Sequence, residues 1–143
     1  MIDKIKIRPY TNEDENLVLA LWRLSFPDAP SHNNFIEDIN RKLTTQGNLF
    51  FVAFYEEKPI GTAMSGFDGH RGWIYYLAVH PNFRRFGVGK KLMQTVETEL
   101  ANIGCTKLNL QIRQNNSNVV EFYKKLGYGV EVRVSMGKLI SNH

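Results

Sequence analysis

The stretch from Tyr75 to Met93, YYLAVHPNFRRFGVGKKLM, most constrains the fold, because it joins an apolar run to a helical pattern through a charged, glycine-containing turn. A helix N-terminus presents backbone N–H groups without partners and carries a partial positive charge. Gly87 and Gly89 lack side chains that would keep an anion away from those groups. Full positive charges surround the turn at Arg84, Arg85 and Lys90. The stretch therefore predicts a phosphate-binding turn between a strand and a helix.

Hydrophobic periodicity along the rest of the chain predicts an α+β fold in a single domain, residues 1–143, with elements in the order βααβββαβαβ. Short links between the middle strands indicate hairpins, and the helical crossover that follows indicates one parallel pairing. We expect a mixed, mostly antiparallel twisted sheet flanked by about four helices. The expected strands are 2–9, 48–55, 60–67, 73–79, 107–112 and 128–136, and the expected helices are 12–25, 35–43, 88–103 and 116–127.

Composition narrows the possible functions. The single Cys105 excludes an internal disulfide and a cysteine cluster for zinc, and the four histidines show no metal-ligand spacing, so we expect no metal. No apolar run has the length of a membrane span, and the start lacks a signal-peptide core, which predicts a cytoplasmic protein without membrane contact. The net charge of +4 suits an anionic partner. Its concentration near the turn favours a localised anion site over a nucleic-acid track.

Three phosphate-binding designs compete for this turn. A Walker A loop requires a glycine where Arg84 stands and a Ser or Thr where Lys91 stands. A dinucleotide-binding fingerprint requires a third glycine at Leu92 and a parallel βαβ unit near the N-terminus. Both designs match poorly, and a plain strand-to-helix turn with a solvated arginine pair is the simplest alternative to any of them.

The third design rests on two motifs. The segment RRFGVG resembles the R/Q-x-x-G-x-G/A signature of the GCN5-related N-acetyltransferase (GNAT) family, whose order of elements is the one expected above. The segment NNSNVVEFYKKLGY resembles the family's N-x(6)-Y-x-x-x-G-[FY] pattern, with Asn116, Tyr123, Gly127 and Tyr128 in register. SGFDGHRGWIYYLAVHP further resembles the bacterial YpeA-like branch. The resemblance covers essentially the whole chain.

The resemblance implies an N-acetyltransferase that uses acetyl-CoA as its co-substrate and moves the acetyl group directly to an amine. The backbone of Leu77 to Val79 would pair with pantetheine as an extra strand, although the side chains of Leu77 and Val79 have the pattern of core residues. Asn116 would bind near the pantetheine arm, cap the last helix, or do both. The implied cofactor-binding residues are Leu77, Ala78, Val79, Arg84, Arg85, Phe86, Gly87, Val88, Gly89, Lys90, Asn116 and Tyr123.

The implied catalytic group is Tyr123, whose hydroxyl would protonate the departing thiolate; a core tyrosine with its hydroxyl bound to a neighbour is the alternative. A strand amide near Val79 would stabilise the oxyanion. Family members place a glutamate where this chain has Trp73 or Gln111, so the usual proton acceptor is missing. Asp68 and His70 in the FDGHRG turn are the nearest candidates, and a turn in which Asp68 caps backbone amides is the simpler interpretation.

The acceptor is not named by the sequence. We expect a small-molecule or peptide amine, no nucleic acid, and a possible homodimer, with Trp22, Phe26, Tyr75 and Tyr76 either lining an aromatic pocket or packing in the core. A different hypothesis is a non-catalytic acyl-CoA-binding sensor or regulatory module, which the missing glutamate favours. A basic nucleic-acid-binding protein is a third hypothesis, and both motifs argue against it.

Overall fold

The computed structural model describes residues 2–29 and 34–141 of the 143-residue chain. The chain divides into two compact units, residues 1–110 and residues 111–143. The first unit contains the sheet and three of the helices, and the second contains the last helix and the C-terminal segment.

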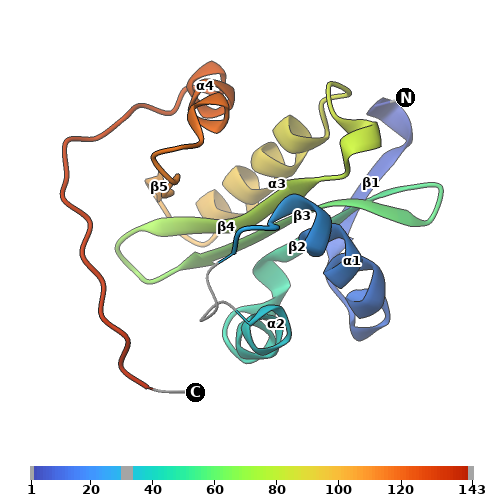
Figure 1. Ribbon diagram of the computed structural model, residues 1–143, viewed down its shortest axis with the longest axis horizontal. Helices are drawn as coiled ribbons and strands as arrows, with labels where there is room; N and C mark the ends of the chain where they lie inside the picture. The colour runs from blue at the N-terminus through green and yellow to red at the C-terminus, as the bar shows by residue number, and fades with distance from the viewer. Residues whose placement is uncertain (1, 30–33, 142–143) are drawn as a thin grey trace. The chain divides into compact units, whose positions relative to one another are not determined.

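One five-stranded sheet in the order β1-β2-β3-β4-β5 forms the centre of the first unit (Figure 1). Its strands are β1 (Ile5–Pro9), β2 (Phe50–Tyr55), β3 (Lys58–Phe67), β4 (Gly72–Val79) and β5 (Leu108–Asn109). The first four pair antiparallel, and β5 pairs parallel to β4 after the helical crossover, as the sequence predicted. Strands β1 and β5 are shorter than expected. A 3-10 turn over Ile2–Lys4 precedes β1, and β5 has only two residues.

The four α-helices of the described chain are α1 (Glu15–Ser25), α2 (Phe35–Thr44), α3 (Val88–Asn102) and α4 (Ser117–Lys125). A short 3-10 turn, Asn12–Asp14, leads into α1, so the helix predicted from residue 12 is confirmed as two consecutive pieces. In the first unit, α3 covers one face of the sheet, and α1 and α2 cover the other (Figure 1). The mixed α+β fold with about four helices is therefore confirmed.

The face under α1 and α2 is packed around Trp22, which is fully buried. Its indole ring lies 5.8 Å from the Phe50 ring centroid and 4.0 Å from that of Tyr76. The indole N–H donates to Thr62 Oγ1 at 2.9 Å, so the polar atom of this buried ring has a partner. Aromatic packing thus connects α1 with the middle of strands β2 to β4.

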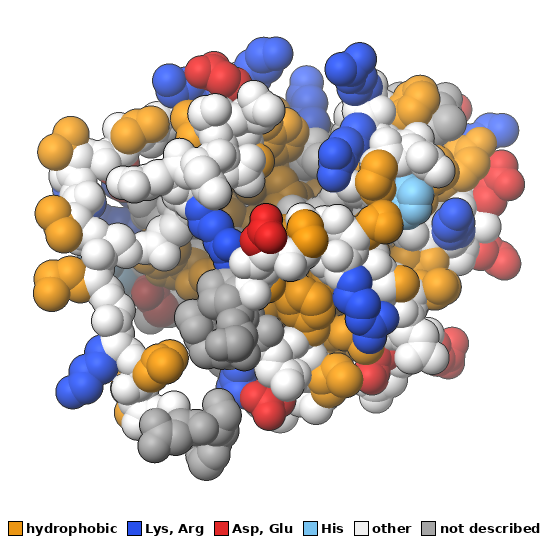
Figure 2. Space-filling view, viewed as in Figure 1, with side chains coloured by type: hydrophobic (Ala, Val, Ile, Leu, Met, Phe, Trp, Pro, Cys, Tyr) orange, Lys and Arg blue, Asp and Glu red, His pale blue; other side chains and the backbone are white. Residues whose placement is uncertain are grey.

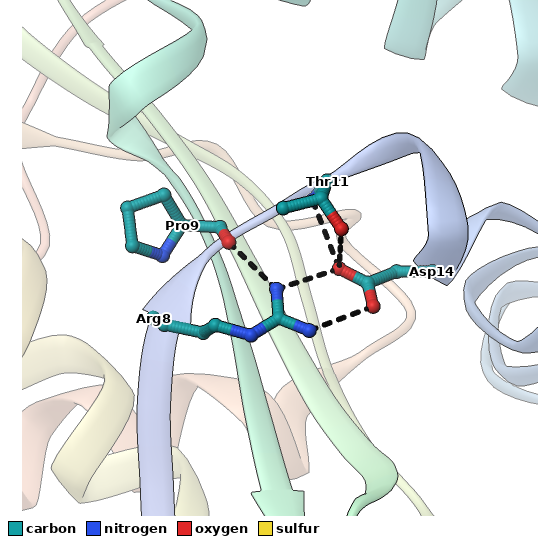
Figure 3. Close-up of polar contacts among 4 residues, drawn as sticks. All are labelled: Arg8, Pro9, Thr11 and Asp14. Atoms are coloured by element: carbon teal, nitrogen blue, oxygen red, sulfur yellow. Dashed lines mark hydrogen bonds and ion pairs between the residues drawn. The ribbon is translucent and has the colours of Figure 1, made fainter.

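A buried carboxylate fixes the start of α1 relative to β1 (Figure 3). Both oxygens of Asp14 accept hydrogen bonds from the guanidinium of Arg8 at 2.9 Å, and Asp14 Oδ2 also accepts the backbone N–H of Thr11 at 2.9 Å. The bond to Thr11 is the reach-back contact that the TNED pattern predicts. Burial alone would raise the pKa of Asp14, but the hydrogen bonds from Arg8 and Thr11 outweigh it and hold the pKa below its ordinary value.

The opposite face permits a close approach between α3 and the sheet. A Cβ atom on Gly61 of β3 would lie 2.9 Å from the carbonyl oxygen of Ala78 and 3.1 Å from the side chains of Val88 and Leu92. Because Gly61 has no side chain, the first turn of α3 rests directly on the sheet. This contact fixes where the helix begins, and therefore where the glycine turn lies.

The expected closing strand over residues 128–136 is wrong, because the described part of the C-terminal segment has no regular secondary structure. Its alternating hydrophobic side chains are exposed and, in Figure 2, hydrophobic groups of this segment stand apart from one another. Alternation of hydrophobic and polar residues shows that a segment is compatible with a half-buried strand. To form a strand, the segment must also pair with the free edge of a sheet. The exposed side chains include Val130 (76%), Val132 (93%), Val134 (89%) and Met136 (91%).

Candidate functional site

The glycine-containing turn lies between β4 and α3. The backbone of His80 leaves β4 into a 3-10 turn, Pro81–Phe83, and α3 begins at Val88. Gly87 is the residue before the helix and has φ = 80°, a left-handed conformation that glycine adopts without strain. Arg85 also has a positive φ, 71°, which is uncommon for a residue with a side chain. The turn therefore leads the chain sharply into the helix, whose first two residues, Val88 and Gly89, are buried. Gly87 and the residues from Arg84 to Phe86 are exposed beside this helix start.

The predicted cations lie beside this helix start and are not paired with carboxylates of the described residues. Arg84, Arg85 and Lys90 are exposed, and none of the three forms an ion pair within residues 2–29 and 34–141. By contrast, Arg8 and Arg41 elsewhere in the chain each contact a carboxylate. Uncompensated positive charge beside a helix N-terminus is the arrangement that binds phosphate groups.

The end of β4 has one edge without a strand partner in the described chain. The backbone N–H of His80 donates to Ile60 on β3 at 2.7 Å. In an antiparallel strand, the N–H and C=O of one residue point to the same edge, and successive residues alternate between the two edges. Since His80 points toward β3, Leu77 and Val79 direct their backbone groups away from it. On that side, β5 pairs only with Gly72 and Trp73, near the other end of β4. The backbone groups of Leu77 and Val79 are therefore available to an extended ligand.

A β-bulge interrupts β4 just before this edge. The pairing of β3 with β4 shifts between Thr62 and Met64, whose partners are Ala78 and Tyr75. Two residues of β4 thus lie opposite a single residue of β3, and the first of them, Tyr76, has a left-handed φ of 51°. Such a conformation costs about 1–3 kcal/mol for a residue with a side chain, so surrounding contacts must hold it.

Contacts on both the side chain and the backbone hold Tyr76. Its ring stacks on Trp22, and its hydroxyl donates to Asp38 Oδ2 on α2 at 2.5 Å. Its carbonyl accepts the hydroxyl of Thr62 at 2.8 Å. Burial, with the added effect of Asp38, raises the pKa of Tyr76 well above its ordinary value, so the phenol stays protonated and acts as a donor.

The four aromatic residues considered for an acceptor pocket do not share one role. Trp22 is fully buried among its neighbours, so for this residue the core alternative holds. Phe26 meets the Tyr76 ring edge-on at 5.6 Å, whereas Tyr75 is 53% exposed. Trp22, Phe26 and Tyr76 therefore pack together in the core between α1, α2 and β4, and Tyr75 does not.

Asp68 caps the hairpin between β3 and β4. Its Oδ1 accepts the backbone N–H groups of His70 and Arg71, each at 2.7 Å. These bonds, that of Arg71 first, lower the pKa of the exposed Asp68 carboxyl. The arrangement is the simpler alternative foreseen from the sequence, and a lowered pKa makes Asp68 a weaker proton acceptor.

In the second unit, Asn116 precedes α4 as its N-cap residue, but its side chain forms no capping hydrogen bond. Tyr123 is 6% exposed and meets the rings of Phe122 and Tyr128 edge-on. These ring contacts fit the core alternative, and the role of the hydroxyl stays a prediction. Burial raises the pKa of Tyr123 well above its ordinary value and keeps the phenol protonated at neutral pH.

The sequence did not identify Asp38 and Thr62 as partners of Tyr76. Asp38 is 38 positions from Tyr76 in the chain, and it has the spacing of an ordinary polar helix residue. Thr62 is fully buried and so needs a hydrogen-bond partner. In the sequence, the only sign of this role is a threonine within a mostly apolar strand.

The described residues provide neither a metal-binding cluster nor a membrane-spanning helix. Residues 2–29 and 34–141 contain no group of three or more His, Cys, Asp or Glu side chains that could hold a metal ion. None of the helices in this part of the chain combines the length and hydrophobicity that a bilayer crossing requires. His32 and His143 lie outside the described residues.

Comparison with known proteins adds information about relatives. Residues 15–128 match the profile of the Acetyltransferase (GNAT) family. The chain is 37% identical over 134 residues to an acetyltransferase of Pectobacterium atrosepticum and 38% identical over 134 residues to one of Yersinia enterocolitica. In each case the match covers 94% of this chain and 94% of the relative.

Solved structures with lower identity share the fold. AAC(6')-Iy, solved in complex with a bisubstrate analogue, has a TM-score of 0.78 at 20% identity, covering 96% of this chain and 99% of that one. The PaiA N-acetyltransferase of Thermoplasma acidophilum, solved with coenzyme A, has a TM-score of 0.71 at 21% identity, covering 91% and 92%. Ard1 of Thermoplasma volcanium has a TM-score of 0.73 at 22% identity, covering 90% and 85%.

Proposed function

We infer that this chain, which belongs to the Acetyltransferase (GNAT) family, is an acetyl-CoA-dependent N-acetyltransferase. It moves an acetyl group from acetyl-CoA to an amine. The observation that carries this conclusion is the family match over residues 15–128, together with the exposed, unpaired cations at the start of α3. Because the match extends through both compact units, we propose that they work as one acetyltransferase domain.

We propose that the turn before α3 binds the diphosphate of coenzyme A. The amides of the first turn of α3 and the charges of Arg84, Arg85 and Lys90 would neutralise it. The exposed Phe86 and Gly87 would supply the surface over which the diphosphate lies, and the backbone of the buried Val88 and Gly89 would border it. The exposure of the cations and the left-handed Gly87 support this assignment.

Pantetheine would continue along the free edge of β4. The N–H and C=O groups that Leu77 and Val79 direct away from β3 would pair with its amides, as an added strand does, with the buried Ala78 between them. The same edge would present a backbone N–H to the thioester oxygen when the amine attacks and negative charge develops there. Asn116, whose side chain forms no cap bond, would bind near the pantetheine arm.

Tyr123 is the proposed proton donor to the departing thiolate. Its raised pKa, which burial causes, keeps it protonated at neutral pH and able to donate that proton. Replacing Tyr123 with Phe should lower kcat while acetyl-CoA affinity remains, whereas Phe122→Leu, a change at its neighbour, should leave kcat near the parent value. Equal kcat for Tyr123→Phe and the parent would contradict the role.

The group that accepts the proton of the attacking amine is proposed only as Asp68 or His70. The hairpin hydrogen bonds lower the pKa of Asp68, so His70 is the better candidate of the two. Alanine at each position, with the pH dependence of kcat/KM measured against the parent, tests the assignment. An unchanged profile for both variants would exclude it.

For the acceptor, we propose a small-molecule or peptide amine. Solved structures of the same fold support both classes of acceptor. One is an aminoglycoside acetyltransferase in complex with sisomicin, and another is the NatC complex bound to a Gag peptide and CoA. The homodimer and the cytoplasmic location expected from the sequence stay predictions. No observation favours nucleic acid as a partner.

Calorimetric titration with coenzyme A and acetyl-CoA, followed by thiol-release assays with polyamines, amino acids, aminoglycosides and N-terminal peptides, tests the function. Cofactor binding and turnover on one acceptor class are the expected result. Binding without turnover on any acceptor would favour the non-catalytic sensor. Failure to bind either cofactor would contradict the assignment of the turn before α3.

A further inference from the structure

The bulge in β4 stands in a strained conformation at the strand edge where the thioester would lie. Tyr76 has φ = 51°, and the next residues, Leu77 to Val79, carry the backbone groups assigned to the cofactor. A left-handed tyrosine relaxes unless its neighbours oppose relaxation. The direction of the N–H groups that follow therefore depends on what holds Tyr76.

Three contacts hold the residue from the α1 and α2 side of the sheet. The Trp22 ring stacks on the Tyr76 ring with an interplanar angle of 10°, and the Trp22 N–H donates to Thr62. The hydroxyl of Thr62 donates in turn to the Tyr76 carbonyl. The third contact is the bond from the Tyr76 hydroxyl to Asp38, which connects the bulge to a charged group of α2.

Asp38 is itself held in place. It forms an ion pair with Arg41 one turn later on α2, and its side chain is 23% exposed. A carboxylate acceptor that is partly shielded from water strengthens a hydrogen bond from a phenol. Helix α2 thus holds the tip of a side chain whose backbone shapes the edge of β4.

We propose that Asp38 is a positioning residue: through its hydrogen bond to Tyr76 it holds the β4 bulge in the conformation that directs the following backbone N–H groups at the thioester carbonyl. This inference rests on the proposed binding of pantetheine along β4. Asp38 does not touch the reacting atoms in this scheme. It acts on the polarisation of the thioester and leaves the phosphate contacts at the start of α3 unchanged.

The test does not require a known acceptor. Acetyl-CoA labelled with ¹³C at the thioester carbonyl is bound to the full-length protein, and the carbonyl NMR shift is compared with that of free acetyl-CoA. A hydrogen bond from a backbone N–H polarises the carbonyl and should move its signal downfield on binding. Coenzyme A, which has no thioester, is titrated in parallel to report the remaining contacts.

Two variants remove the hydrogen bond in different ways. Tyr76→Phe keeps the stacked ring and removes the hydroxyl, and Asp38→Ala removes the acceptor; each should lose roughly half or more of the bound carbonyl shift. Asp38→Asn keeps an oxygen acceptor and should retain most of the shift. Coenzyme A affinity should stay within roughly twofold of the parent in all of them.

The matched control is Glu37→Gln, which removes a carboxylate from the neighbouring position of α2. The carboxylate of Glu37 lies 3.9 Å from the Arg41 guanidinium, and the Tyr76 hydroxyl donates to Asp38 instead, so the parent shift is expected. Near-UV circular dichroism identifies any variant that fails to fold. If Asp38→Ala fails to fold, the carbonyl shifts of Tyr76→Phe and Asp38→Asn are compared in its place.

The possible outcomes are distinct. Tyr76→Phe with the parent carbonyl shift would overturn the proposal, as would a parent protein that binds acetyl-CoA without any shift. A parent that binds neither coenzyme A nor acetyl-CoA would instead overturn the proposed function.

Discussion

The sheet of the first unit and the C-terminal segment have similar hydrophobic patterns but different structures. Strand β2 buries Phe50 to Ala53 between strands on either side, whereas the alternating valines of residues 130–134 are exposed and unpaired. Both stretches have β-branched or aromatic residues typical of strands. The difference shows that a strand pattern becomes a strand only where a neighbouring edge and a covering layer are available.

The largest effect should come from the aromatic core of the first unit. Trp22→Ala should lower the free energy of unfolding by about 3–5 kcal/mol, because it removes a fully buried ring and leaves Thr62 without its donor. Denaturant titration followed by circular dichroism measures it. Trp73→Ala, at a partly exposed tryptophan of β4, is the control and should cost less. Similar losses for both would mean that packing around Trp22 is not the main stabilising contact of this face.

The polar link between β1 and α1 should have the next largest effect. Asp14→Asn should cost about 2–3 kcal/mol at neutral pH, because the Arg8 guanidinium loses its paired carboxylate. Since the pKa of Asp14 is lower in the folded protein than in the unfolded chain, its stabilisation is complete above the unfolded value and is lost as pH falls through the folded value.

Urea titrations of Asp14→Asn and the parent between neutral and acidic pH measure this dependence. The two stabilities should converge as pH falls below about 4, where the carboxyl becomes protonated in the unfolded chain. Glu13→Gln, a change at the exposed neighbouring carboxylate, is the control. A gap between Asp14→Asn and the parent that stays constant with pH would contradict the role of the charge.

The sequence predicted the parts of the fold whose signals are local. The helical spacing of Leu92, Val96 and Leu100 and the glycine before Val88 indicated α3 and the turn that precedes it, and both are confirmed as structure. The anion site at that turn stays a prediction. Hairpin lengths likewise indicated the antiparallel sheet. These features depend on neighbouring residues in the chain, so periodicity and turn chemistry are sufficient to find them.

The remaining features depend on contacts between distant residues. The bulge at Tyr76 is held by Trp22, Thr62 and Asp38, which are 14 to 54 positions away, and no local pattern encodes it. The expected closing strand is wrong because pairing, too, depends on distant residues. Its alternation is local, but the partner that would make it a strand is not.

Coenzyme A affinity should distinguish exposed cations that contact the ligand from exposed cations that do not. Arg84→Ala should weaken coenzyme A binding by roughly tenfold, because one charge-assisted contact to the diphosphate is lost, and should leave the unfolding free energy unchanged. Lys58→Ala, at an exposed cation of the β2–β3 hairpin, should bind like the parent. Calorimetry at two salt concentrations measures both, and equal affinities for the two variants would show that Arg84 does not contact the phosphates.

The smallest effect should come from the C-terminal segment. Val132 is 93% exposed, so Val132→Ala should change the unfolding free energy by less than about 0.5 kcal/mol, whereas Val52→Ala in the buried strand β2 should cost about 2 kcal/mol or more. Denaturant titrations measure the unfolding free energy of both variants. Since each variant removes the same two methyl groups, any difference reflects burial of the valine. A loss above about 1 kcal/mol at Val132 would mean that the segment finds a strand partner in solution, and the alternation of its valines would then have predicted pairing correctly.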